Sequence, residues 1–148
     1  MSISIQETDF DVGKETEALS SGDDGAGAVA TFVGLVRGEG IEAMTLEHYP
    51  AMTEKALAEI VAQAQARWQL RRVRVIHRVG RLLPGDRIVF VGVSSSHRGD
   101  AFAACEFIMD YLKTQAPFWK KEETAAGARW VDARESDDTA ASRWERGS

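Results

Sequence analysis

Apolar and polar residues alternate along much of the chain, and this period of two predicts strands. A short strand is expected at Ile3–Gln6. The nearly continuous apolar run Ala28–Val36 is rich in β-branched and aromatic side chains, which is typical of a buried strand. Beyond the break at Arg37–Gly40, the apolar positions Met44 and Leu46 predict a second, half-exposed strand.

The middle of the chain predicts a hairpin. Four mostly apolar positions alternate here with arginines, namely Val73, Val75, His77 and Val79 with Arg72, Arg74 and Arg78. This pattern gives a strand with one basic face, which we expect to be solvated or to face a partner. A Pro-Gly turn at Leu83–Asp86 then leads to a central strand at Ile88–Val93, which completes the hairpin. Two short extended segments are expected around 118–121 and 130–133.

Helical spacing of apolar residues predicts two long helices and one short one. The short one is expected at Phe10–Leu19, and the first long helix follows Pro50, with its apolar stripe at Leu57, Ile60, Val61, Ala64 and Trp68. In the second, Asp100 is a candidate cap, Pro117 ends the helix, and the stripe comprises Phe102, Cys105, Ile108, Met109 and Leu112. Helices mixed with hairpins predict a single α+β domain over residues 1–134, followed by a polar, mobile tail at 135–148.

Composition narrows the class of protein. The chain has 148 residues, of which 44% are hydrophobic, so it is long enough to bury a core. The net charge of -5 argues against nucleic acid as a partner, and no apolar run approaches the roughly 20 residues that cross a bilayer. The single cysteine, Cys105, excludes an internal disulfide and a cysteine-based metal cage. We therefore expect a soluble cytoplasmic protein that binds no metal and no cofactor.

Basic residues at the ends of apolar elements are the candidates for chemistry. Arg37 follows the first apolar strand, the loop Ser94–Gly99 contains His97 and Arg98, and Lys113 and Lys120 flank the proline break. Together these groups would suit an anion such as phosphate. Each also has an ordinary structural interpretation, because strand-end arginines reach solvent, serine loops cap helices, and cations favour helix C-termini. The functional interpretation requires that the three segments converge in space.

Other candidates are weaker. Cys105 lies on the apolar stripe of its helix, where a buried thiol is expected to act as a small hydrophobic group. His77 lies on the apolar face of its strand and is expected to pack. The three histidines show no metal-ligand spacing, and the sequence contains no glycine-rich phosphate-binding loop.

The same segments resemble the molybdopterin synthase catalytic subunit family. The resemblance spans about Gly27–Ala133 and is carried by GAVATFVGLVRGE, LEHYPAMTEKALAEI, HRVGRLLPGDRIVFVGVSSSHRGDAFAACEFIMDYLKTQAPFWKKE and RWVDA. It implies an α+β fold of the hammerhead type and a homodimer that binds a small ubiquitin-like sulfur carrier at each end. It also implies sulfur transfer from the carrier's C-terminal thiocarboxylate to cyclic pyranopterin monophosphate, which forms the dithiolene of molybdopterin.

The resemblance also assigns residues. The two essential lysines of the family fall on Lys113 and Lys120, and its arginine and His-Arg pair fall on Arg37, His97 and Arg98. Further binding positions fall on Phe32, Leu35, Val36, Lys121 and Glu122. The segment Gly38–Glu42 is shorter here than in many relatives. We expect Lys113 to act as general acid and base near the carrier's carbonyl, and Lys120 to hold the pterin or developing negative charge.

Two other classes of function compete with this hypothesis. The first is a non-catalytic scaffold that binds a ubiquitin-like carrier. The presence of both lysines together with Arg37 and His97 argues against a scaffold. The second is a nucleic-acid-binding domain that uses the basic strand and Trp119. The negative net charge of the chain argues against this class.

Overall fold

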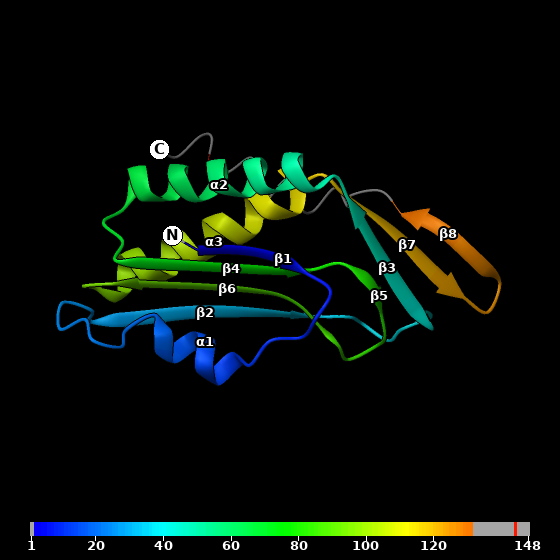
Figure 1. Ribbon diagram of the computed structural model, residues 1–148, viewed down its shortest axis with the longest axis horizontal. Helices are drawn as coiled ribbons and strands as arrows, with labels where there is room; N and C mark the ends of the chain where they lie inside the picture. Colours follow the sequence, from blue (N-terminus) through cyan, green and yellow to red (C-terminus); the bar gives the residue numbers. More distant parts are fainter. Residues whose placement is uncertain (1, 132–143, 145–148) are drawn as a thin grey trace.

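The computed structural model describes residues 2–131 and 144, and it divides them between two four-stranded sheets with three helices (Figure 1). The first sheet has the order β1-β4-β6-β2, and the second has the order β5-β3-β7-β8. In chain order the elements are β1 Ser2–Gln6, α1 Val12–Ala18, β2 Ala28–Leu35, β3 Ala43–His48, α2 Pro50–Arg67, β4 Arg72–Arg78, β5 Gly80–Leu82, β6 Arg87–Ser95, α3 Arg98–Gln115, β7 Phe118–Thr124 and β8 Gly127–Val131. The predicted α+β class is confirmed.

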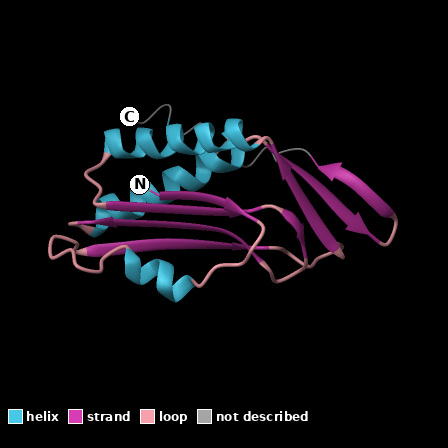
Figure 2. Cartoon of the chain, viewed as in Figure 1, coloured by secondary structure: helices cyan, strands magenta, loops and turns pink. Residues whose placement is uncertain are grey.

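The first sheet is mixed and is covered by helices on both faces (Figure 2). Strand β1 pairs with β4 in parallel, whereas β4 with β6 and β6 with β2 are antiparallel. Helices α2 and α3 cover one face, and the main core lies between them and valines of β4 and β6. The short helix α1 covers the other face, where Phe10 and Leu19 pack on Ile76 and Phe90. None of the helices in the described residues is long and apolar enough to cross a membrane.

The predicted hairpin is confirmed as a pairing of β4 with β6, and a third short strand, β5, lies between them in the sequence. Between the two strands the chain leaves the first sheet, and Gly80–Leu82 forms β5, which pairs with β3 in the second sheet. The turn that follows places Pro84 before Gly85, whose φ of 90° belongs to the left-handed region that glycine favours. Asp86 closes this turn, because its main-chain N–H donates to Leu83 O at 2.9 Å.

Three expectations about burial and capping are wrong. Strand β2 forms where predicted, but as an edge strand of the sheet it leaves Phe32 40% and Leu35 55% exposed. Phe102 is 66% exposed, because the buried stripe of α3 runs through Ala101, Ala104, Cys105, Ile108 and Leu112 instead. The N-cap of α3 is His97. Asp100 lies within the first turn, where its negative charge interacts favourably with the helix dipole.

The basic face of β4 is partly covered by the same chain. Helix α1 and its flanking loops cover it, and Arg72 donates to the main-chain oxygens of Ala18 and Ser21 at 2.8 and 2.7 Å. Arg74 pairs with Glu15 at 2.9 Å on the same face. These arginines therefore anchor the N-terminal segment on the sheet.

The predicted tail at 135–148 lies outside the described residues except for Trp144. The Trp144 ring meets Trp68 and Phe107 edge to face, and its indole Nε1 donates to Asp110 Oδ2 at 2.6 Å. Trp144 thus lies against the layer formed by α2 and α3.

Candidate functional site

A cavity of about 520 Å³ lies where the two sheets meet. Its walls come from the end of β2, the start of β6, the last turns of α3 and the inward faces of β3 and β7. Most of the residues that line it are apolar, including Phe32, Leu35, Val36, Ile41, Met44, Leu46, Ile88, Leu112 and Phe118. The sequence reaches this geometry because Pro117 ends α3 beside the cavity and the chain turns directly into β7.

Three cationic side chains converge on this apolar cavity. Arg37 follows β2, Lys113 lies in the last turn of α3, and Lys120 lies in β7. Glu122, whose side chain is 12% exposed, adds one carboxylate and lies 3.7 Å from the Arg129 guanidinium. Two of the three basic segments found in the sequence therefore meet in one place.

Strand alternation decides which residues of β7 face the cavity. Lys120 pairs with Leu46 and Glu122 pairs with Met44, and these four side chains all line the cavity. Lys121 lies between them and points to the opposite face of the sheet, where its Nζ is 5.7 Å from the centre of the Trp130 ring. The structure thus places Lys121 outside the cavity.

His97 and Arg98 lie at the other end of α3 from Lys113. The helix rises about 1.5 Å per residue, so Arg98 and Lys113 are about 22 Å apart along its axis. Both residues are exposed, and neither lines the cavity. Within one chain the third basic segment does not join the other two.

His77 is the cavity residue whose role sequence reasoning missed. The side chain was expected to pack, and it does so, since it is 6% exposed and stacks on Phe118 at 3.9 Å. It also lines the cavity beside Lys113. The available signal was a polar ring on the otherwise apolar face of β4, just before the chain changes sheets.

Cys105 lies in the core, away from the cavity. Burial raises the pKa of its thiol to about 12, with a further contribution from the negative charge of Glu106. Its Sγ donates weakly to Val91 O at 3.7 Å. Among the described residues, no group of three or more His, Cys, Asp or Glu side chains could hold a metal ion. From the part of the chain that the structure describes, the cavity therefore receives positive charge, one carboxylate and an imidazole, and no cysteine.

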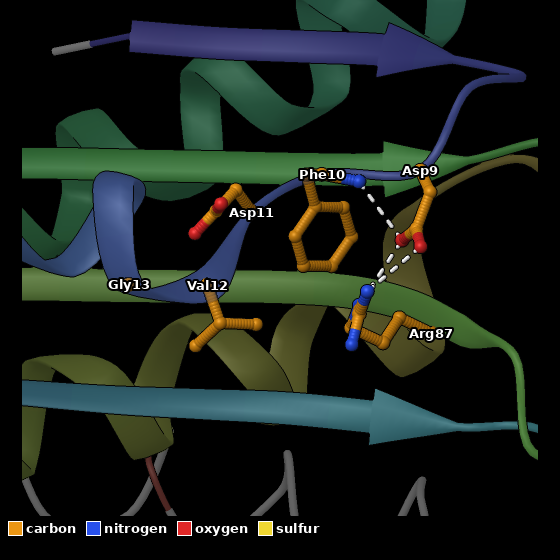
Figure 3. A pocket seen from close by; sticks show the side chains of 6 residues that line it. All are labelled: Asp9, Phe10, Asp11, Val12, Gly13 and Arg87. Carbon is orange, nitrogen blue, oxygen red and sulfur yellow. Dashed lines mark hydrogen bonds and ion pairs between the residues drawn. The ribbon is translucent and has the colours of Figure 1, made fainter.

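A second hollow, of about 550 Å³, lies beside the start of α1 (Figure 3). Asp9 and Arg87 line it and form two hydrogen bonds with each other, at 2.8 and 3.1 Å. The Arg87 guanidinium lowers the pKa of Asp9, and the Phe10 main-chain N–H lowers it further. Asp11 accepts a bond from Lys14 N at 3.0 Å as the helix cap. The charged groups of this hollow thus hold the N-terminal segment in place.

The fold is an α+β fold of two sheets, and the site is a cavity between them that is lined by apolar residues and by three cationic side chains. Residues 5–115 match the family model for the MoaE protein, and the chain belongs to that family. The molybdopterin synthase catalytic subunit of Vibrio cholerae is 62% identical over 147 residues, which cover 97% of this chain and 97% of that relative.

Solved structures agree with this assignment. The molybdopterin biosynthesis MoaE protein from Burkholderia ambifaria has a TM-score of 0.86 and 59% identity, with 97% of each chain covered. A complex of subunits 1 and 2 of molybdopterin-converting factor from Helicobacter pylori has a TM-score of 0.75 over 89% of this chain and 91% of that chain. At 20% identity this last likeness shows a shared fold.

Proposed function

We propose that this chain transfers sulfur from the C-terminal thiocarboxylate of a small ubiquitin-like carrier to cyclic pyranopterin monophosphate, which forms the dithiolene of molybdopterin. The observation that carries the proposal is the convergence of Arg37, Lys113 and Lys120 on one apolar cavity. Positive charges held at fixed positions in a cavity stabilise an anionic tail and developing negative charge better than they would in bulk water. The 62% identity with the molybdopterin synthase catalytic subunit of Vibrio cholerae also supports this proposal.

The chemistry needs acid–base groups and no protein nucleophile. The thiocarboxylate sulfur forms a bond to an oxygen-bearing carbon of the pterin precursor. The carbon–oxygen bond at that carbon breaks and the oxygen takes up a proton as it leaves, so that the carrier stays attached to the precursor as a thioester. Water then attacks the thioester carbonyl, the carbon–sulfur bond to the carrier breaks, and the carrier leaves as a carboxylate while sulfur stays on the precursor. Two such transfers, from two carriers, complete the dithiolene. This scheme agrees with the position of Cys105 in the core, away from the cavity.

We assign roles by position in the cavity. Lys113 is the general acid and base near the carrier's carbonyl, and Lys120 holds the pterin or the negative charge of the tetrahedral intermediate. Arg37 binds the phosphate through its planar guanidinium. Phe32, Leu35 and Val36 form the apolar wall, and Glu122 accepts from donors of the substrate. Lys121 points away from the cavity, and the proposal gives it no part in the chemistry.

His97 and Arg98 fit the proposal if they reach the cavity of a second copy of the chain. Within one chain they are about 22 Å along α3 from Lys113. A single chain also leaves Val29, Phe32 and Leu35 of the edge strand β2, and Phe102 of α3, exposed. Apolar side chains left exposed on an edge strand and on the neighbouring helix favour association with another surface. We therefore propose a homodimer in which the His97–Arg98 pair of each copy completes the phosphate site of the other.

The carrier is the second partner. The Helicobacter pylori structure with this fold is a complex of two subunits of molybdopterin-converting factor, which supports an assembly of two different chains. The carrier's glycine tail would enter the cavity as an extended strand. We place the reaction in the cytoplasm, where reducing conditions preserve the thiocarboxylate.

Reconstitution tests the proposal. The purified chain is mixed with thiocarboxylated carrier and cyclic pyranopterin monophosphate, and molybdopterin is followed as its fluorescent oxidation product. Lys113→Ala and Lys120→Ala should each lower the rate by about 100-fold or more, the usual contribution of a positioned acid–base group. Lys121→Ala is the matched control, because the same change on the opposite face of β7 should leave most of the activity.

The scaffold alternative predicts a different result. A chain that binds the carrier but forms no product under these conditions would be a scaffold, and the catalytic proposal would fail. Full activity in Lys113→Ala would remove Lys113 from the mechanism while leaving the reaction in place.

A further inference from the structure

His77 is held rigidly at the inner wall of the cavity. It is the second-last residue of β4, and the chain enters the second sheet three residues later, at Gly80. Its ring stacks on Phe118, with 3.9 Å between ring centres and 20° between ring planes. Phe118 in turn begins β7 and pairs with His48 of β3. Parts of both sheets therefore fix the orientation of the imidazole.

The hydrogen bonds of His77 identify which ring nitrogen carries the proton. Nδ1 lies 2.8 Å from the main-chain oxygen of Arg78. A carbonyl oxygen can only accept, so Nδ1 must donate and carries the hydrogen. Burial, with a smaller contribution from the charge of Lys113, lowers the pKa of His77 to about 4, although the hydrogen bond to Arg78 O acts to raise it. The ring is therefore neutral near pH 7, and Nε2 presents a lone pair.

Nε2 is open to the cavity. Among the described residues, no hydrogen bond joins Nε2 to another group. The fully buried side-chain polar atom without a partner in this part of the chain is His48 Nδ1. Nε2 is therefore not fully buried. His77 is also one of the residues that line the cavity. Because the ring is otherwise enclosed, the cavity is the space that Nε2 faces.

The other polar groups of the cavity make this acceptor distinctive. Arg37, Lys113 and Lys120 are donors and carry positive charge. Glu122 accepts, but its negative charge attracts cations as well as neutral donors. His77 Nε2 is a neutral acceptor at a fixed position. Because the three cationic side chains of the cavity repel a positively charged ligand, the donor that Nε2 meets is an uncharged N–H group.

We propose that His77 determines specificity at this site, because its Nε2 accepts a hydrogen bond from an uncharged N–H group of the bound ligand. The inference rests on the proposed function, which supplies two sources of such a group. One is a ring N–H of the heterocyclic substrate, and the other is a main-chain amide of the carrier's tail. His77 moves no proton in either case; it selects and orients the ligand.

Three variants separate this role from a structural one. His77→Asn keeps a donor near the position of Nδ1 for Arg78 O but removes the acceptor at Nε2. His77→Gln places an amide oxygen near the position of Nε2, and His77→Phe keeps the stack on Phe118 while removing both nitrogens. The folded state of each variant is checked by its Tm. If the Phe variant does not fold, the Asn variant alone tests the loss of the acceptor.

Binding is measured by calorimetry without turnover, for the thiocarboxylated carrier and for the pterin precursor in separate titrations. Loss of one neutral hydrogen bond corresponds to an affinity loss of about tenfold. We expect His77→Asn and His77→Phe to lose about this much for one of the two ligands, and His77→Gln to bind nearly as wild type. Weakened precursor binding identifies a ring N–H as the donor, and weakened carrier binding identifies a tail amide.

Three other results would overturn the inference. If His77→Asn and His77→Phe bind both ligands as tightly as wild type, His77 is a packing residue and the proposed function stands. Equal losses in all three variants would likewise indicate packing. If the wild-type chain binds neither ligand, both the inference and the proposed function fail.

Discussion

Arg67 at the end of α2 donates a hydrogen bond to the main-chain oxygen of Trp144 at 2.7 Å, although 77 positions separate the two residues in the sequence. The same guanidinium lies 4.9 Å from the centre of the Phe107 ring on α3. The Trp144 indole adds its contact with Asp110 Oδ2. Trp144 therefore joins the two helices that cover the main core.

The first prediction is that Trp144→Ala destabilises the fold. The variant loses two edge-to-face ring contacts and the bond to Asp110, so we expect the free energy of unfolding to fall by about 2 kcal/mol, less than for a fully buried tryptophan. Urea unfolding followed by circular dichroism measures the change. Trp130→Ala is the control, because that side chain is 57% exposed and should change stability little. Equal losses in the two variants would contradict a specific anchor.

The second prediction concerns the two copies of the proposed dimer. His97→Ala and Lys113→Ala should each abolish most activity when assayed alone. Mixed dimers of the two variants should regain activity, because one of their two cavities then combines an intact Lys113 with an intact His97 from the other copy. Co-expression with two different tags isolates the mixed dimers for the reconstitution assay. Inactive mixed dimers would place His97 and Lys113 in the same chain's site, or remove His97 from the chemistry.

The third prediction follows from the buried imidazole of His77. Its pKa is about 4 in the folded chain against 6.5 in the unfolded chain. Above pH 6.5 the imidazole is neutral in both states, so its contribution to the free energy of unfolding does not change with pH there. As the pH falls from 6.5 to 4 the unfolded chain binds a proton that the folded chain does not, and stability falls by about 1.4 kcal/mol per pH unit. The summed loss is about 3 kcal/mol over this window.

Urea unfolding at pH 7, 6 and 5 measures this effect. Other groups titrate in the same range, so the wild-type slope is compared with that of His77→Phe. We expect a shallower slope in the variant. An unchanged slope would mean that His77 is not the buried neutral group that its position indicates.

The fourth prediction is that Cys105 takes no part in sulfur transfer. With its pKa raised to about 12, the thiol stays protonated near pH 8 and should resist alkylation by iodoacetamide until the chain is unfolded in urea. Cys105→Ala should retain sulfur transfer and lose about 1 kcal/mol of stability, because a small buried group is removed. Rapid alkylation of the native chain, or an inactive alanine variant, would contradict this.

The sequence predicted the elements of the fold better than their surroundings. The strand at β2 was predicted from its apolar side chains, but Phe32 and Leu35 are exposed in the single chain. An apolar pattern indicates that a surface should be covered, and it does not say whether the same chain covers it. The position of Phe102 has the same explanation, because a rotation of one residue around α3 separates it from the buried Ala101.

The site was predicted in part. Arg37, Lys113 and Lys120 were selected by their residue types and by resemblance, and the structure brings them to one cavity. The separation of Lys121 from Lys120 depends on which face of β7 meets the first sheet, and a run of two lysines contains no such information. His77 was expected to pack because it shares a face with valines; its second role depends on a cavity built from elements distant in the sequence.

The pairing of β7 with β3 has a consequence for tolerance to mutation. The strand carries the doublets Lys120–Lys121 and Glu122–Glu123, and only one member of each faces the cavity. If a single residue were deleted before Trp119, every side chain of the strand would exchange faces. Lys121 and Glu123 would then occupy the inward places, so the cavity would keep one amine and one carboxylate. The deletion would also put the Trp119 ring in the place of Phe118, where one aromatic ring replaces another. An insertion at the same point would instead put the Trp119 ring in the place of Lys120, so this strand can absorb a slip of register in one direction and not in the other.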